Sequence, residues 1–274
     1  MEDLALGVVT WSKGDPIEAI KWVKSMDVLT MQLGCPPDEY FSNPKRQELV
    51  EELTASGIRI TVIFCAYEGE DYSRVIETIG LTNPALREER IIKTFKIADL
   101  ANDLGVDKIG AHVGPIPEER TDTIYQGMVE AVRKIVDYCR KNDQFFLLET
   151  GQEPAEVLLH FIQDVGRDNL GINFDPANLI LYGSGDPIQA LEILKEHVLG
   201  VHVKDARFPK NGDLFQAQTR LGEGDVDIVG FIKGLKKICY RGPLTIEREV
   251  RDKNQQTKDV LDAKIFLEKL CAKI

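Results

Sequence analysis

A chain of 274 residues with 43% hydrophobic residues can bury one large core, so we expect a single domain over residues 1–274. Its formal net charge of -11 opposes the phosphate backbone of nucleic acids, which argues against a nucleic-acid partner and favours a small-molecule ligand. No basic, apolar leader opens the sequence and no run approaches the roughly 18 apolar residues of a membrane span, so we expect a cytoplasmic protein without a membrane partner.

Short β-branched runs alternate with amphipathic helical stretches along the whole chain, at intervals of about 30 residues. This alternation is typical of βα units around a parallel sheet, and it predicts an α/β protein with a single (βα)8 TIM barrel. In chain order, the expected strands cover residues 4–10, 28–33, 58–65, 108–113, 145–149, 170–174, 198–204 and 243–247. The expected helices cover residues 16–25, 44–56, 86–104, 121–141, 154–165, 187–195, 226–238 and 259–272.

Proline marks the start of several expected helices, because its missing N–H costs nothing in the first helical turn. The start signals are Asp15-Pro16, Asn43-Pro44, Glu153-Pro154 and Asp186-Pro187.

Two connections are longer than ordinary loops, residues 66–85 and residues 205–225. Each follows the carboxyl end of an expected strand, on the barrel face where active sites lie. We therefore expect both to cover a functional site.

Potential metal ligands end the last four expected strands, namely Glu149, Asp175, His202 and Glu247. A single acidic residue at a strand end is more often a helix cap or a solvated residue, and a lone histidine could equally be a core residue. The occurrence of all four together favours a shared site. Three converging carboxylates would repel one another unless a cation neutralised them. Three oxygen donors and one imidazole suit one divalent metal ion, with Mn²⁺ or Mg²⁺ favoured and Co²⁺ as an alternative.

Five sequence elements lie in order at the carboxyl side of the last four expected strands: Glu149-Thr150, Asn173-Phe174-Asp175-Pro176-Ala177-Asn178, His202-Val203-Lys204-Asp205, Leu221-Gly222-Glu223-Gly224 and Leu244-Thr245-Ile246-Glu247-Arg248-Glu249. Together they resemble the xylose-isomerase-like TIM barrel superfamily of sugar isomerases and epimerases. The resemblance covers nearly the whole chain and implies that Glu149, Asp175, His202 and Glu247 bind the metal. Many family members carry histidine where this chain has Asn178, so Asn178 is interpreted as a substrate contact and not as a ligand.

Other residues near these strand ends are candidate substrate contacts. His112 follows the fourth expected strand, with a structural hydrogen bond as the alternative role. Trp11 could form an apolar wall for a sugar ring or simply pack. Lys204 and Arg207 could hold a substrate oxygen or phosphate, although Lys204 could equally pair with a nearby carboxylate.

Two further polar residues have candidate roles. Gln32 lies near the end of the second expected strand and is interpreted as a polar contact to the pocket, and Glu223 in its glycine-flanked turn is interpreted as a loop organiser.

The favoured function is a metal-dependent aldose–ketose isomerase or ketose epimerase for a small sugar or keto-polyol, working through proton abstraction and an enediolate. In epimerase branches of the superfamily the glutamates that match Glu149 and Glu247 also form the acid/base pair, and the resemblance permits that role here. A dehydratase or lyase of a keto-inositol or 3-keto sugar is the alternative. A non-catalytic metal-binding subunit and an endonuclease are less favoured, and a homo-oligomer stays open.

Overall fold

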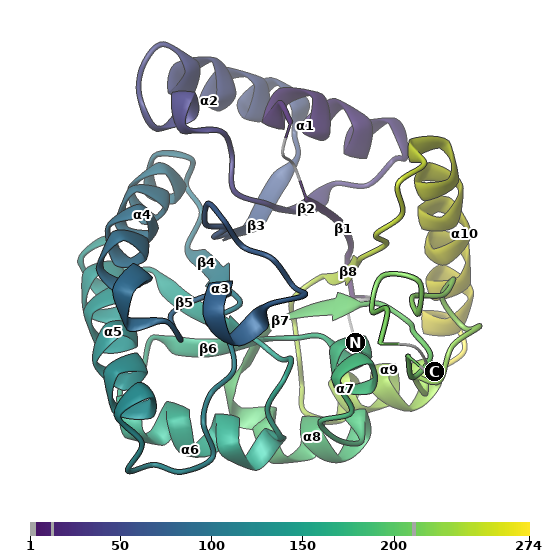
Figure 1. The fold of residues 1–274 in the computed structure, drawn as a ribbon. Helices are drawn as coiled ribbons and strands as arrows, with labels where there is room; N and C mark the ends of the chain where they lie inside the picture. Colours follow the sequence, from purple (N-terminus) through teal and green to yellow (C-terminus); the bar gives the residue numbers. More distant parts are fainter. Residues whose placement is uncertain (1–3, 12–13, 210–211) are drawn as a thin grey trace.

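The fold is an eight-stranded closed barrel whose strands follow one another in chain order and are all parallel (Figure 1). The computed structural model describes residues 4–11, 14–209 and 212–274. The closed parallel sheet confirms the predicted (βα)8 barrel. Its strands are β1 (Leu6–Thr10), β2 (Thr30–Leu33), β3 (Arg59–Phe64), β4 (Lys108–Ala111), β5 (Phe145–Glu149), β6 (Leu170–Phe174), β7 (Val198–Val203) and β8 (Leu244–Ile246).

Helices surround the barrel and cover its outer face (Figure 1). The outer ring consists of α1 (Pro16–Ser25), α2 (Lys45–Ser56), α4 (Pro84–Asp103), α5 (Thr123–Cys139), α6 (Ala155–Val165), α8 (Pro187–Leu194), α9 (Ile228–Lys237) and α10 (Lys253–Cys271). Short additional elements are α3 (Val75–Thr78), α7 (Pro176–Tyr182) and the 3₁₀ turns η1 (Asp38–Phe41), η2 (Arg140–Asn142) and η3 (Lys195–His197).

Several helices begin where the proline signals predict, and others do not. Pro16 and Pro187 open α1 and α8, each after an aspartate whose side chain accepts backbone N–H groups. Pro44 and Pro154 instead precede the first residues of α2 and α6, so the prediction was wrong there. Helix α10 begins at Lys253, ahead of the expected residue 259, because Asp252 caps it through the N–H groups of Asn254 and Gln255.

Helix α7 was not predicted, although it begins with the same signal. Asp175 accepts the N–H groups of Ala177 and Asn178, and Pro176 occupies the first turn. The helix ends at Gly183, whose φ of 65° is the left-handed conformation that glycine adopts without strain. A metal-ligand candidate thus also fixes the start of a helix at the barrel mouth.

The buried apolar side chains of the described residues form two separate clusters. The larger one lies between the sheet and the helices. The smaller one consists of Val62, Phe64 and Leu147, with Phe145 and Leu199 packed against it. Leu147 precedes Glu149 by two residues on β5, so both side chains point to the same face of the strand. The candidate ligands therefore lie above a small apolar plug.

The connection after β3 contains α3 and is anchored at both of its ends. The carboxylate of Glu70 accepts the N–H groups of Tyr67 and Gly80. Arg90 of α4 is buried and donates to the carbonyl groups of Thr78 and Gly80. These contacts hold the segment across the barrel mouth, as Figure 1 shows for α3.

The connection after β7 is organised by Asp205 and not by the Glu223 side chain. Both carboxylate oxygens of Asp205 accept backbone N–H groups, one from Ala206 and Val226 and the other from Gly222 and Gly224. A Cβ on Gly224 would lie 2.1 Å from Oδ1 of Asp205, so only glycine fits there.

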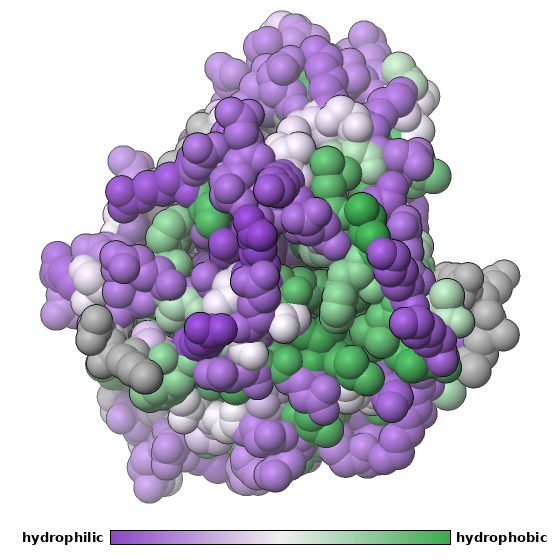
Figure 2. Space-filling view, turned by 90° about the vertical axis from the view of Figure 1, so that its right-hand side faces the viewer, coloured by the Kyte–Doolittle hydropathy of each residue, from purple (hydrophilic) through white to green (hydrophobic). Residues whose placement is uncertain are grey.

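The molecular surface is largely hydrophilic on the face that Figure 2 shows. Hydrophilic residues cover most of the face shown in Figure 2, and hydrophobic residues gather toward the middle of that view. Among the described helices, none combines the length and apolar character that crossing a membrane would require.

Candidate metal centre

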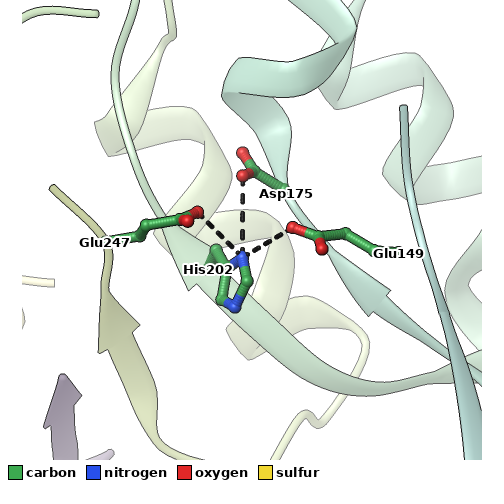
Figure 3. Close-up of side chains that lie close together, drawn as sticks. All are labelled: Glu149, Asp175, His202 and Glu247. Carbon is green, nitrogen blue, oxygen red and sulfur yellow. Dashed lines mark ion pairs between the residues drawn. The ribbon is translucent and has the colours of Figure 1, made fainter. Parts of the chain in front are cut away.

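Four side chains from adjacent strand ends converge above the apolar plug (Figure 3). Nδ1 of His202 lies 2.9 Å from Oε1 of Glu149, 3.0 Å from Oε2 of Glu247 and 3.6 Å from Oδ2 of Asp175. The candidate ligand atoms all lie within 4.8 Å of one another. The four side chains are at most 2% exposed, so their charges are shielded from solvent.

The donor set fits a divalent cation. Among the described residues, Oε2 of Glu149, Oδ2 of Asp175, Nδ1 of His202 and Oε2 of Glu247 are buried without a hydrogen bond of normal geometry. Leaving several such atoms unsatisfied costs roughly 1–3 kcal/mol each, more for charged groups. A cation that accepts lone pairs from all four would remove this cost. Three hard oxygen donors and one imidazole match Mn²⁺, Mg²⁺ or Co²⁺ in chemical type.

Electrostatics within the cluster also favour a positive charge at its centre. Burial lowers the pKa of His202, but Glu247 and Glu149 outweigh that effect and hold the pKa well above its ordinary value. Burial raises the pKa of Glu247, yet Lys204 and His202 bring it below its usual range. The three carboxylates thus stabilise whatever cation lies among them, and a metal ion competes with the proton on Nδ1.

Asp175 is held rigidly by the strand-to-helix turn. Its Oδ1 caps α7, which leaves Oδ2 facing the cluster. Its backbone N–H donates to Oγ1 of Thr150 at 2.8 Å, and that hydroxyl donates to its carbonyl at 2.9 Å. Thr150 therefore joins the ends of β5 and β6 and fixes the separation of two candidate ligands.

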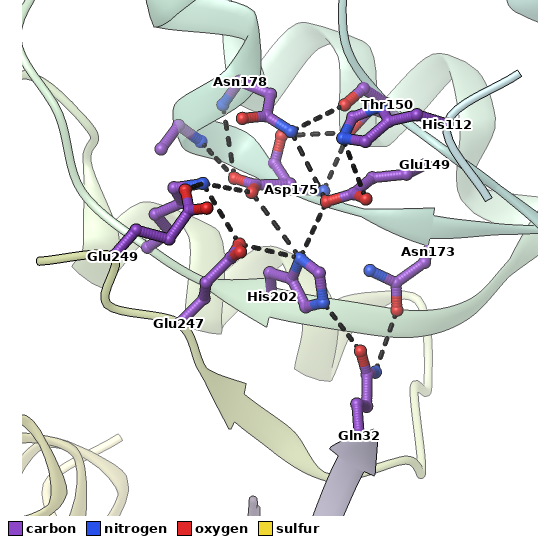
Figure 4. A network of polar contacts seen from close by, with 12 residues as sticks. Gln32, His112, Glu149, Thr150, Asn173, Asp175, Asn178, His202, Glu247 and Glu249 are labelled. Atoms are coloured by element: carbon purple, nitrogen blue, oxygen red, sulfur yellow. Dashed lines mark hydrogen bonds and ion pairs between the residues drawn. The ribbon is translucent and has the colours of Figure 1, made fainter. Parts of the chain in front are cut away.

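Glu149 and Glu247 have different polar neighbours (Figure 4). Nε2 of His112 lies 3.0 Å from Oε2 of Glu149, and Nδ2 of Asn178 donates to Oε1 of Glu149 at 3.4 Å. The indole N–H of Trp11 donates to Oε1 of Glu247. Each glutamate thus has one aromatic nitrogen beside it, from His112 at Glu149 and from Trp11 at Glu247.

Lys204 is buried against three carboxylates. Its Nζ lies 2.8 Å from Oε2 of Glu249, 3.2 Å from Oε2 of Glu247 and 3.7 Å from Oδ2 of Asp175. Burial lowers the pKa of Lys204, but Glu247 and Glu249 keep it well above its ordinary value, so the ammonium is charged. Glu249 is itself held by Nε2 of Gln218 at 2.7 Å, which ties β8 to the connection after β7.

The remaining sequence candidates lie in two different environments. Trp11 is 38% exposed and packs edge-to-face against Phe64 and His202, so it borders the cluster. Arg207 is exposed and donates from Nε and Nη2 to the carbonyl of Glu223, which directs its guanidinium to the loop backbone.

A groove of about 1230 Å³ opens beside the cluster. Its walls include Trp11, Trp22, Phe215 and Glu249. Since Trp11 contacts Glu247 and Glu249 contacts Lys204, the groove borders the polar residues of the centre.

Sequence reasoning missed several residues of this centre. Thr150 and Asn173 lie in the sequence elements of the family resemblance, but no role was predicted for them. Glu249 lies two residues after Glu247, so strand alternation could have placed both side chains on the same face. Tyr72 comes edge-on to His112 at 5.9 Å between ring centroids, and no local signal in the sequence connects these two residues.

A buried acid, Glu153, lies in the loop that follows β5. Burial raises its pKa to about 7, although backbone N–H groups of Glu153 and Ile116 partly oppose this. Because the pKa of Glu153 in the folded state exceeds its ordinary value of 4.5, the folded state binds the proton more tightly and loses stability as pH rises from about 4.5 through about 7.

We expect Glu153→Gln to stabilise the protein at pH 8 by up to about 3 kcal/mol, since a neutral amide avoids burying a charge. At pH 4.5 the wild type carries the proton in the folded state, so the gain should nearly vanish. Thermal unfolding of both proteins at the two pH values measures this difference. An equal effect of the substitution at both pH values would contradict it.

Comparison with known proteins assigns the family. Residues 20–270 match the sequence model of the xylose isomerase-like TIM barrel family. The chain belongs to this family. Within it, the crystal structure of a xylose isomerase domain protein from Planctomyces limnophilus is 36% identical, with a TM-score of 0.92 over 99% of both chains.

More distant solved structures share the fold. A D-psicose 3-epimerase from Clostridium cellulolyticum H10, solved with D-tagatose, is 16% identical with a TM-score of 0.76 over 98% of this chain and 99% of that one. The probable 3-DHS dehydratase of petrobactin synthesis from Bacillus anthracis is 17% identical with a TM-score of 0.70 over 97% of this chain and 99% of that one.

A sequence relative is also similar over part of the chain. An uncharacterized protein of Methanocaldococcus jannaschii is 29% identical over 187 residues, which span 62% of this chain and 62% of that protein.

Proposed function

We propose that this protein is a divalent-metal-dependent isomerase or epimerase of a small sugar or keto-polyol. The observation that carries the proposal is the placement of Glu149 and Glu247 on opposite sides of His202, with Asp175 completing the set (Figure 3). Two carboxylates that flank one centre can remove a proton from one side of a substrate carbon and return one from the other.

Glu149, Asp175, His202 and Glu247 would hold the ion. When bound, the ion would supply Lewis-acid polarisation of a substrate carbonyl, which acidifies the neighbouring C–H group. A carboxylate shared with a cation is a weaker base, so substrate binding must loosen one glutamate for it to take the proton. The indole N–H of Trp11 donates to Glu247 and the ammonium of Lys204 pairs with it, and both favour its charged form, which suits Glu247 to act as the base.

Glu149 would then be the acid. Its neighbour His112 is 15% exposed and lies 3.0 Å away, so it can pass a proton between Glu149 and the solvent side of the site. Glu149 and His112 would in this way reset the acid after each turnover.

The substrate would enter from the mouth of the barrel. His112, Lys204 and Asn178 offer polar contacts for hydroxyl groups, and Trp11 offers an apolar wall against a sugar ring. Arg207 would meet only a group that extends past the loop after β7, because its guanidinium is bound to the Glu223 carbonyl.

A dehydratase of a keto-inositol or a related keto sugar is the second candidate. It would begin with the same proton abstraction and then expel a hydroxyl group. The structural likeness to a probable dehydratase makes this outcome worth testing in the same assay.

The deciding experiment incubates the metal-loaded protein with a panel of ketohexoses, ketopentoses and keto-inositols in D₂O. We expect deuterium to enter one carbon next to the carbonyl, together with a new epimer or isomer, as detected by NMR and mass spectrometry. Loss of water from the substrate would favour the dehydratase. Absence of both exchange and net conversion across the panel would contradict a proton-transfer enzyme for these substrates.

A further inference from the structure

We propose that Gln32 is a positioning residue for the metal, because its amide oxygen holds the Nε2 proton of His202 and so leaves Nδ1 free to bind the ion. This inference rests on the proposed metal-dependent function. It concerns a residue of β2, on the far side of the barrel from the strand ends that supply the four ligands.

The contact lies inside the barrel (Figure 4). Nε2 of His202 is 2.6 Å from Oε1 of Gln32, and Nε2 of Gln32 donates to Oδ1 of Asn173 at 2.9 Å. His202 and Asn173 are 0% exposed and Gln32 is 1% exposed. Three buried polar side chains from β7, β2 and β6 therefore form one chain of contacts across the barrel interior.

The donor and acceptor roles in this chain follow from chemistry. Gln32 uses its amide N–H group on the carbonyl oxygen of Asn173, so its own oxygen faces His202. An oxygen can only accept, and Nε2 of His202 must therefore carry the proton. A neutral imidazole with its proton on Nε2 has its lone pair on Nδ1, which is the atom that faces the three carboxylates.

The barrel is locally irregular at the two residues that support His202. In the part of the chain that the structure describes, the strand register shifts between Met31 and Gln32 and again between Ile172 and Asn173. Bulges of this kind re-aim side chains and are common beside active sites. The extra residues are Thr61 of β3 and Leu199 of β7, so the bulges lie in the strands that pair with Gln32 and Asn173.

A glycine makes room for the same chain of contacts. Gly200 of β7 pairs with Asn173, and a Cβ at Gly200 would lie 2.5 Å from Oδ1 of Asn173. Burying two amide side chains in the barrel interior costs free energy unless they form hydrogen bonds. Here the hydrogen bonds orient a histidine that is a candidate metal ligand. Loss of a residue that orients a metal ligand typically weakens metal affinity by about 10–100-fold.

The test compares Mn²⁺ affinity, measured by competition with a chelator, in the wild type, Gln32→Met and Gln32→Glu. Methionine keeps the length of the side chain but lacks the acceptor, whereas glutamate restores it. Asn173 can serve the glutamate by turning its amide, since its Nδ2 has no hydrogen-bond partner among the described residues. Co²⁺ absorption spectra of the same proteins report the ligand environment independently of activity.

Gln144→Met is the matched control. Gln144 is also buried at 1% exposure, and its Nε2 donates to the carbonyl groups of Ala98 and Val106, away from the metal centre. Its loss should lower thermal stability and leave Mn²⁺ affinity unchanged.

We expect Gln32→Met to bind Mn²⁺ at least about tenfold more weakly with an altered Co²⁺ spectrum, and Gln32→Glu to bind at least as tightly as the wild type. Wild-type affinity in a folded Gln32→Met protein, or an equal loss in Gln144→Met, would overturn the inference. Should Gln32→Met fail to fold, Gln32→Glu decides alone, because tenfold weaker binding in that variant overturns the inference and undiminished binding supports it. A wild type that binds no divalent ion would instead contradict the metal centre itself.

Discussion

Replacing either central glutamate, as Glu149→Gln or Glu247→Gln, should reduce turnover and substrate proton exchange by at least about a hundredfold. Glutamine keeps an oxygen that can bind the ion, but it has no group that can take the proton. The two variants should differ in detail, because Glu247 is held by Trp11 and Lys204 whereas Glu149 is held by His112 and Asn178.

Deuterium exchange from D₂O and metal content should be measured on the same samples. A suitable control is Glu249→Gln, which removes the surface-side carboxylate from Lys204 but leaves the four candidate ligands in place. We expect this control to retain the metal and at least one tenth of the wild-type exchange. If both central variants stay metal-loaded and exchange protons near the wild-type rate, neither glutamate moves the proton, and His112 or Lys204 becomes the next candidate.

The second large effect concerns metal binding, which Asp175→Asn and His202→Ala should each weaken by at least about tenfold without loss of the fold. Asp175→Asn removes a ligand charge at almost constant volume. The remaining side-chain oxygen can still cap α7, so the expected cost to folding is on the order of 1 kcal/mol.

Asp186→Asn is the matched control for Asp175→Asn. Asp186 also precedes a proline and also caps a helix, α8, through the N–H groups of Ile188 and Gln189. It lies outside the cluster, so its substitution should change stability by a similar amount and metal affinity not at all. Equal metal affinity in the wild type, Asp175→Asn and His202→Ala would show that Asp175 and His202 are not metal ligands.

The barrel and the strand-end quartet could be predicted because both depend on local signals. Alternation of strands and helices defines the βα units, and residues that end neighbouring parallel strands meet at one face. Glu149, Asp175, His202 and Glu247 could therefore be grouped from their positions in the sequence, and the structure brings them together.

Helix α7 could have been predicted but was not. Asp175-Pro176 is the same start signal as Asp186-Pro187, yet Asp175 was interpreted only as a ligand. The Asp175 carboxylate can serve as a helix cap and as a candidate ligand at once, because Oδ1 caps the helix while Oδ2 faces the cluster.

The contact between Gln32 and His202 could not be predicted from local sequence. Closure of the barrel brings these side chains of β2 and β7 together across its interior, and closure leaves no local pattern in one sequence. The buried position of Lys204 among Asp175, Glu247 and Glu249 likewise depends on how the mouth closes.

Elemental analysis of the wild type and Asp175→Asn, both purified without chelators and then dialysed against Mn²⁺, tests the central claim most directly. We predict one divalent ion per wild-type chain and a clearly lower content in the variant, together with a higher unfolding temperature of the loaded wild type. A wild type that retains no metal, and whose stability and proton exchange do not respond to Mn²⁺, Mg²⁺ or Co²⁺, would contradict the metal centre.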